Sequence, residues 1–202
     1  MMLSGNTPYV AARAKARRQA LMDKSRLRQL INQSPEQLTN AVAESGYQNE
    51  INLYASKYTG GDLVEAALTH NLENELSKIL SFCNGRVRKI VEIYTGRYEY
   101  QNAKAVLRAV ANDIDAEKVG KDILPDLNEI NTPWIKILES ADDLPSAALQ
   151  MRRKSFGSAL TSLPENAGLA QYEDALDRHY FSSAMASLSH SSSDARYLRN
   201  VL

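Results

Sequence analysis

The feature that most constrains the fold is a helix-forming stretch that runs from Gly60 to Arg108. Apolar residues recur in it every three or four positions, on both sides of the short polar segment 81–85. This spacing places apolar side chains along one face of an α-helix. The Asn84-Gly85 pair within the polar segment is typical of a helix end followed by a turn. The stretch therefore predicts two long helices joined by a tight turn, that is, a helical hairpin.

The apolar faces of these two helices are expected to lie in a core. The first helix is predicted to begin with Asp62 as its capping residue, and its apolar face consists of Leu63, Ala67, Leu68, Leu72, Leu76, Ile79 and Leu80. The return helix, from Arg86 to about Ala109, has the apolar face Val87, Ile90, Val91, Tyr94, Tyr98, Val106 and Leu107. Leu72 and Leu76 are thus predicted core residues, whose replacement by alanine costs about 2–5 kcal/mol. Core packing is also expected for Tyr94 and Tyr98.

The N-terminal part of the chain is predicted to be helical too. A long helix is expected from Pro8 to about Ile31, because proline is favourable in the first turn of a helix. Ser34 and Gln37 have the spacing of a capping box, and Gly46 is typical of a left-handed helix end. Residues 47–58 show helical spacing again.

The C-terminal part of the chain also favours helix. Residues 112–165 lack the period-two alternation of strands and contain several proline-containing turns, so short helices are predicted there. A longer helix is predicted from Leu169 to Leu188, and a last one begins at Asp194. Only 9 Gly and 6 Pro occur in 202 residues. The predicted fold class is all-α, built of helical hairpins and short helices.

A weaker copy of the Gly60–Arg108 stretch follows 108 residues downstream. Leu68 falls on Leu176, and Leu80 on Leu188. Two unrelated amphipathic helices would share this phase, but the polar turn also recurs, with Ser81 on Ser189. We therefore predict a duplication, with residues 1–110 as the first helical repeat and residues 111–202 as the second. The counterpart of Arg97–Arg108 would begin at position 205, so the sequence is expected to be a fragment whose second repeat is truncated in its last helix.

The sequence contains no recognisable catalytic, cofactor-binding or metal-binding pattern. It has no Gly-x-x-x-x-Gly-Lys-Ser/Thr loop and no Gly-x-Gly-x-x-Gly turn. Cys83 is the single cysteine, and the three histidines are scattered. No apolar run approaches the ~18–20 residues needed to span a bilayer. We therefore expect a soluble, intracellular protein that has no catalytic site, cofactor or metal.

Charge is unevenly distributed along the chain. Residues 1–33 carry seven cations against Asp23, and the remaining residues are acidic in balance. Segment 13–28 holds all seven cations, and such a cluster suits a solvated face, an acidic protein, lipid headgroups or nucleic-acid phosphates. Tyr94, Tyr98 and Tyr100 lie near further arginines, a combination that is common in protein interfaces. The candidate partner-binding residues are Arg13, Arg17, Arg18, Lys24, Arg97 and Arg108.

Four stretches resemble the C subunit of the archaeal and bacterial A/V-type rotary ATPases, whose vacuolar counterpart is the d subunit. They are residues 9–16, 58–68, 97–108 and 172–181. The most specific is Arg97-Tyr98-Glu99-Tyr100-Gln101-Asn102-Ala103-Lys104-Ala105-Val106-Leu107-Arg108. Glu99 is a mild departure from the family pattern, because the family commonly has aspartate at this position.

The resemblance implies an all-helical, funnel-shaped protein built of three similar repeats, of which this chain would hold the first and most of the second. Such proteins sit on the cytoplasmic end of the membrane proteolipid ring and hold the foot of the central stalk. They turn with the rotor, bind no nucleotide and catalyse nothing. The implied partners are the ring and stalk subunits, and the implied location is cytoplasmic and peripheral to the membrane. The alternative that the residues leave open is a nucleic-acid-binding or regulatory adaptor that uses segment 13–28.

Overall fold

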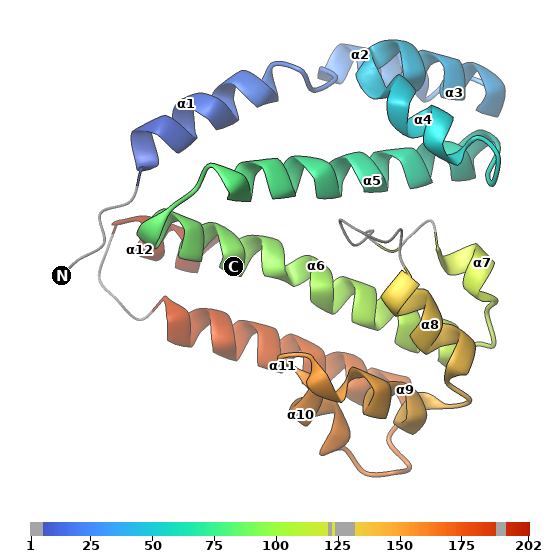
Figure 1. The fold of residues 1–202 in the computed structure, drawn as a ribbon, viewed down its shortest axis with the longest axis vertical. Coiled ribbons are helices and arrows are strands. Elements are labelled where there is room, and N and C mark those ends of the chain that lie inside the picture. The colour runs from blue at the N-terminus through green and yellow to red at the C-terminus, as the bar shows by residue number, and fades with distance from the viewer. Residues whose placement is uncertain (1–5, 121–122, 124–131, 189–192) are drawn as a thin grey trace. The chain divides into compact units, whose positions relative to one another are not determined.

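The computed structural model describes residues 6–120, 123, 132–188 and 193–202, apart from the side chains of Glu117, Thr132 and Asp194. Every regular element in these ranges is a helix, which confirms the predicted all-α class (Figure 1). No described helix combines the length and hydropathy needed to cross a membrane. The chain divides into two compact units, with the boundary between Val87 and Arg88. The division into repeats 1–110 and 111–202 is a separate question and stays a prediction.

Unit 1 comprises the chain up to Val87 and is built of short helices against one long helix. Its elements are α1 (Thr7–Arg18), α2 (Lys24–Leu30), α3 (Pro35–Val42), a π-helical turn (Ala43–Tyr47), α4 (Gln48–Tyr54) and α5 (Gly60–Ser81). The helix predicted from Pro8 to Ile31 is therefore two helices. The chain breaks because the Asp23 side chain caps α2, accepting a hydrogen bond of 2.8 Å from the Arg26 backbone N–H.

Local signals in the sequence account for some of the remaining helix ends in unit 1. Ser34 and Gln37 form the predicted capping box, and Gly46 adopts the expected left-handed conformation with φ 105°. The prediction that Asp62 caps α5 is wrong. Gly60, with φ 55°, turns the chain directly into the helix, and Asp62 lies in its first turn.

The core of unit 1 lies where α3 and α4 pack on α5, and it includes only the first half of α5. Its members are Leu30, Ala41, Val42, Ala43, Tyr47, Ile51, Tyr54, Leu63, Val64, Ala66 and Ala67. Beyond Leu68 the apolar face of α5 lies outside this core. Leu72 is 38% exposed, so its prediction as a core residue is wrong, and Leu76 is only partly buried. Helical periodicity identified the correct face of α5, but not how much of it is covered.

Unit 2 comprises Arg88 to Leu202 and contains nearly all of α6. Its elements are α6 (Gly85–Ala111), α7 (Ala116–Val119), α8 (Thr132–Ser140), α9 (Leu144–Gln150), a 3₁₀ turn (Met151–Arg153), α10 (Gly157–Thr161), α11 (Leu169–Ser187) and α12 (Ser193–Val201). Their core buries large side chains completely, among them Tyr172, Phe156, Leu107, Ile123 and Met151. A smaller cluster joins Leu188, Ala195 and Leu198 to α6. Because α5 and α6 belong to different units, their packing as a hairpin stays a prediction.

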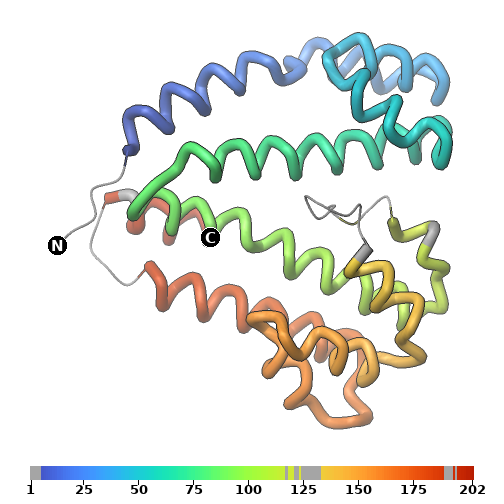
Figure 2. The backbone as a smooth tube through the Cα atoms, in the orientation of Figure 1, coloured from blue at the N-terminus to red at the C-terminus, as the bar shows by residue number. Residues whose placement is uncertain are grey.

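The spacing of the helices in the first part of the chain repeats in the second part, and the chain can be followed in Figure 2. Relative to α3, α4 and α5, the helices α9, α10 and α11 begin 109 residues later, at Leu144, Gly157 and Leu169. α12 begins 108 residues after α6. In the sequence alignment, with its offset of 108, Leu176 of α11 corresponds to Leu68 of α5, which is only partly buried. With an offset of 109 it corresponds to Ala67, and both residues are fully buried. For α5 and α11, the pattern of burial therefore favours an offset one residue larger than the sequence alignment gave.

Candidate interaction surface on α1 and α5

α1 lies along the C-terminal half of α5 and runs antiparallel to it (Figures 1 and 2). At one end the Asn6 side-chain amide donates to the Phe82 carbonyl over 2.7 Å, and the Asn84 N–H donates back to Asn6 over 3.1 Å. The Tyr9 ring meets the Phe82 ring edge-on, with 6.3 Å between centroids. Further along, Arg17 of α1 meets Glu75 of α5. α1 is therefore held at two points.

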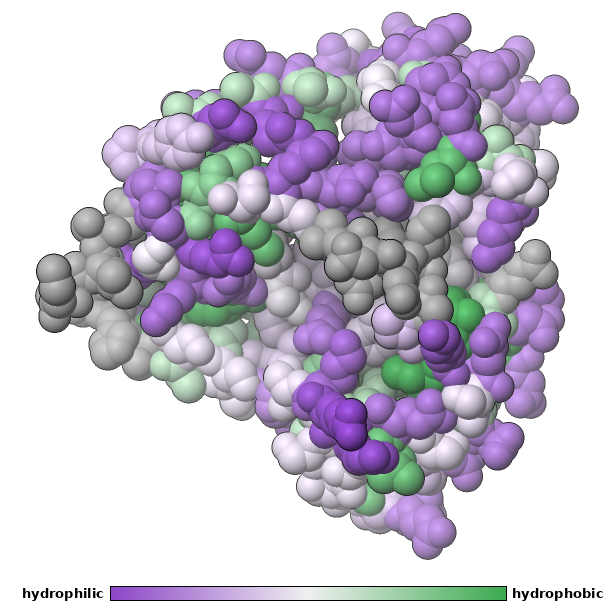
Figure 3. All heavy atoms as spheres, viewed as in Figure 1, coloured by the Kyte–Doolittle hydropathy of each residue, from purple (hydrophilic) through white to green (hydrophobic). Residues whose placement is uncertain are grey.

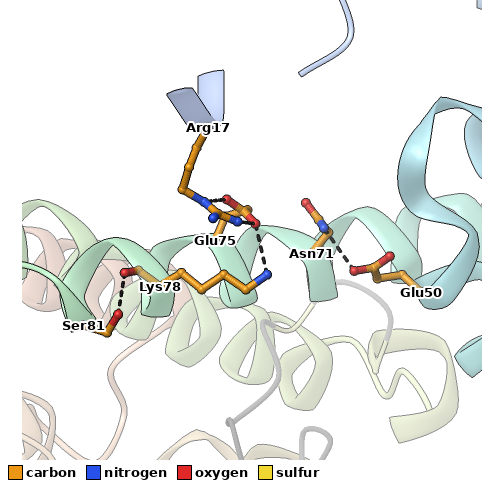
Figure 4. Close-up of polar contacts among 6 residues, drawn as sticks. All are labelled: Arg17, Glu50, Asn71, Glu75, Lys78 and Ser81. Carbon is orange, nitrogen blue, oxygen red and sulfur yellow. Dashed lines mark hydrogen bonds and ion pairs between the residues drawn. The ribbon is translucent and has the colours of Figure 1, made fainter. Parts of the chain in front are cut away.

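The Arg17–Glu75 ion pair is the central polar contact of this surface (Figure 4). The guanidinium donates from Nε and Nη2 to the two carboxylate oxygens, and Lys78 lies 3.3 Å from the same carboxylate. The hydrogen bond from Arg17 lowers the pKa of Glu75, and the bond to Glu75 raises the pKa of Arg17. Such bidentate pairs are strong and directional. Arg17 therefore positions α1 and is not free for a partner.

The same ion pair divides the space between α1 and α5 into two grooves. One, of about 600 Å³, is the more polar of the two, and Asn71 donates there to Glu50 over 3.1 Å. The other, about 400 Å³, we call the apolar groove. It is lined by Leu68, Leu72, Leu76 and Ile79 of α5, by Ala14, Arg17, Arg18 and Leu21 of α1 and the segment after it, and by Tyr47, Asn71 and Glu75. In Figure 3, apolar side chains show among hydrophilic ones in the upper part of the view, where Figure 1 has α1 and α5.

The other cations predicted in unit 1 have different surroundings. The Arg13 guanidinium carbon lies 5.2 Å from the Phe82 ring centroid and 5.8 Å from that of Tyr9, which are cation–π distances. Arg18 and Lys24 are exposed, and within the described part of the chain neither forms an ion pair. Arg18 and Lys24 therefore keep the charge that a partner would meet.

The two cations predicted in α6 are engaged within unit 2. Arg108 pairs with Glu173 of α11. The Arg97 guanidinium lies 5.3 Å from the ring centroids of both Tyr94 and Tyr98. Tyr94 is 38% exposed, so its prediction as a core residue is wrong. The six candidate residues thus fall into two separate groups, four in unit 1 and two in unit 2.

Sequence reasoning missed two tyrosine–histidine pairs. The Tyr54 hydroxyl lies 3.1 Å from His70 Nδ1, and the Tyr100 hydroxyl lies 2.9 Å from His179 Nδ1. Burial lowers the pKa of His70 and raises the pKa of Tyr54 to about 12. The partners lie on different helices, so residue spacing carried no signal for either pair.

Among the described side chains, no group of three or more His, Cys, Asp or Glu residues is placed to hold a metal ion. Cys83 is buried, with its Sγ 3.1 Å from the Ile79 carbonyl oxygen. What unit 1 presents is an apolar groove beside exposed cations, which is a surface suited to another macromolecule.

Fold and surface together define an all-helical protein with apolar and basic helix faces available for contact. Over residues 10–202 the sequence matches the family model described as ATP synthase (C/AC39) subunit. The chain belongs to this family, and the resemblance to the C subunit of the rotary ATPases is confirmed.

Relatives named as the C subunit of A-type ATP synthase give the same result. The relative from Haloquadratum walsbyi is 31% identical over 204 residues, which cover 98% of this chain and 58% of the relative. The relative from Haloferax volcanii is 29% identical, covering 87% of this chain and 51% of the relative. The one from Methanosarcina acetivorans is 27% identical, covering 92% and 51%. The chain thus spans a little over half the length of these relatives.

Proposed function

We propose that this chain acts in a non-catalytic rotor subunit of an A/V-type ATPase or ATP synthase. In this role it joins the membrane proteolipid ring to the central stalk on the cytoplasmic side of the membrane, and so couples ion transport to the turnover of ATP. The observation that carries the proposal is the family match over residues 10–202.

The construction of unit 2 suits a part that transmits torque, because such a part must resist bending and twisting. α6 has 27 residues and α11 has 19. Lys104 of α6 is 2.7 Å from Asp177 of α11, and Arg108 pairs with Glu173 one turn away. Exposed ion pairs contribute only about 0–1 kcal/mol each, but they fix how the helices face each other. The dense core beneath them supplies the stiffness.

The internal contacts of segment 13–28 weigh against the nucleic-acid-binding alternative. Arg17 is paired with Glu75, and Arg26 donates to the Ser45 hydroxyl and to the Ala41 carbonyl. Two of its seven cations are therefore hydrogen-bonded inside unit 1, and a third, Arg13, lies over the Tyr9 and Phe82 rings. A phosphate-tracking surface needs such groups to be free.

The proposal assigns no catalytic residue, cofactor or metal to the chain, and it is tested by purification from native membranes. The full chain carrying an affinity tag is expressed in its own cells, and the membranes are solubilised in mild detergent. We expect proteolipid and central-stalk subunits to co-purify, as identified by mass spectrometry. A variant with the buried Phe156 replaced by Asp is the control for capture by the tag. Recovery of neither ring nor stalk subunits with the native chain would overturn the proposal.

A further inference from the structure

The α5 side of the apolar groove is a continuous apolar stripe. Leu68, Leu72, Leu76 and Ile79 follow one another at intervals of four, four and three residues. At 1.5 Å per residue, the stripe is ~16 Å long, or three helical turns. Leu68 packs against the core of unit 1, and the rest of the stripe lies beyond that core, with Leu72 38% exposed and Leu76 and Ile79 partly buried. A partly exposed stripe of this length matches the contact face of a second helix.

α1, which forms the other side of the groove, does not cover this stripe completely. The long side chains of Arg17 and Glu75 meet between the two helices and keep them apart. The remaining space of about 400 Å³ holds a few aliphatic side chains, but not a whole helix. Leu21, which is 58% exposed, lies at its edge. An occupant would therefore insert one row of side chains and keep its backbone outside.

The charged residues around the groove indicate which charge a partner should carry. α1 contains four cations and no acidic residue, whereas α5 contains four acidic residues and Lys78. Arg18 lines the groove and forms no ion pair among the described residues. Glu75, the acidic group that lines the groove, is neutralised by Arg17 and Lys78. Of the three charged residues that line the groove, Arg17, Arg18 and Glu75, only Arg18 is left without an ion pair among the described residues. The remaining charge of the lining is therefore positive, and the complementary partner is acidic.

We infer that the apolar groove is a docking site for an acidic amphipathic helix of a partner protein. The apolar face of that helix, with anchors every three or four residues, seats against Leu72 and Leu76, and its Asp or Glu side chains face Arg18. Binding of a helix in a groove by such anchors is a recurrent mode of recognition. The inference rests on the geometry of unit 1 and does not depend on the proposed function.

The probe for the test is a synthetic 16-residue helical peptide, labelled with fluorescein, that has leucine on one face and glutamate on the flanks. Its binding to the full chain is followed by fluorescence anisotropy at low salt. We expect saturable binding that weakens as salt is added, because screening reduces the attraction between charges. A matched peptide with lysine in place of glutamate should bind about tenfold more weakly or worse. Equal binding of the two peptides would overturn the inference.

Paired variants locate the site. Arg18→Glu and Leu72→Ser should each weaken binding of the acidic peptide by about tenfold, since anchors and their charged neighbours dominate such contacts. The controls are Arg28→Glu and Leu53→Ser. Both replace exposed residues that do not line the groove, and both should change affinity by less than about twofold. Unchanged melting curves establish that all four variants are folded.

Other ligands give outcomes that overturn the inference. Phosphatidylglycerol vesicles or duplex DNA that bind more tightly than the acidic peptide, with sensitivity to Arg18→Glu but not to Leu72→Ser, would assign the surface to lipid or nucleic acid. If Arg18→Glu and Leu72→Ser leave peptide affinity unchanged while ring and stalk subunits still co-purify with the native chain, this inference fails and the proposed function stands.

Discussion

Two helix pairs in this molecule, α6 with α11 in unit 2 and α1 with α5 in unit 1, are held together in different ways. In unit 2, the Tyr100 ring of α6 packs among aromatic side chains, 4.8 Å from the Phe156 centroid, 5.2 Å from Tyr180 and 5.9 Å from the His179 ring. In unit 1, α1 meets α5 through Asn6, Tyr9 and Arg17, with grooves on both sides of the ion pair.

Ion pairs and buried apolar side chains contribute differently to the stability of the two helix pairs. Both helix pairs contain ion pairs, Arg17–Glu75 in unit 1 and Lys104–Asp177 in unit 2. Only α6 and α11 also bury large side chains between them and the short helices. Buried apolar area contributes roughly 25 cal/mol per Å², whereas an exposed ion pair contributes about 0–1 kcal/mol. The α6–α11 pair is therefore held mainly by its core, whereas the α1–α5 pair leaves part of its apolar surface exposed.

The largest expected difference is between two leucines on the long helices. Leu176→Ala in unit 2 removes a fully buried side chain and should cost about 2–5 kcal/mol in the free energy of unfolding. Leu72→Ala in unit 1 removes a side chain that is already 38% exposed, and should cost about 1 kcal/mol or less. Urea unfolding of the two variants measures both costs. Equal losses would show that the C-terminal half of α5 is packed as tightly as α11.

A smaller difference is expected when one ion pair is removed in each unit. Glu75→Gln should release α1, because that pair is one of its two attachments to α5. Asp177→Asn should leave α11 in place, because the core holds it. Each change should cost roughly 1 kcal/mol of stability. Hydrogen exchange should show faster exchange in α1 for the first variant and unchanged exchange in α11 for the second; equal protection of α1 in both variants contradicts the comparison.

The smallest expected effect is a pH dependence in unit 1. Burial holds the pKa of His70 below its ordinary value of 6.5, while the Glu50 carboxylate opposes that shift. Below pH 6.5 the folded state therefore binds fewer protons at His70 than the unfolded state does. The neutral His70 ring contributes its full stabilisation of the fold above pH 6.5, and this stabilisation is lost as the pH falls through the folded pKa. The urea midpoint should therefore fall on acidification below pH 6.5.

The variant His70→Gln isolates this effect, because it removes the titrating ring. Its urea midpoint should depend less on pH than that of the native chain over the same range. Identical pH dependence in the two proteins would exclude His70 as its source.

Local signals in the sequence predicted much of the fold. Helical spacing, the Ser34–Gln37 capping box and the left-handed Gly46 all have their cause within a few residues. The break after α1 was missed, because residues 19–22 include Gln, Ala and Leu, which favour helix. The exposure of Leu72 was missed for another reason. Spacing identifies the apolar face of a helix, but the depth of burial depends on elements that are distant in sequence.

The interaction surface was predicted in part. The concentration of cations in segment 13–28 is local and marked α1 as a candidate. The engagement of Arg17 by Glu75, 58 residues away, could not be predicted from spacing, nor could that of Arg108 by Glu173. The pairing of Tyr54 with His70 also joins separate helices. Charge composition therefore marked the region, and the fold decided which cations remain available.

The central claim is that unit 1 presents the α1–α5 face to another protein while unit 2 serves as the rigid part. The most direct measurement places a photo-crosslinking amino acid at Leu72 of the tagged chain in native membranes, with the exposed Leu53 of α4 as the control position. We expect position 72, and not position 53, to crosslink to an acidic helical segment of another protein. Crosslinks from position 72 to lipid alone, or equal crosslinking from both positions, would contradict the account.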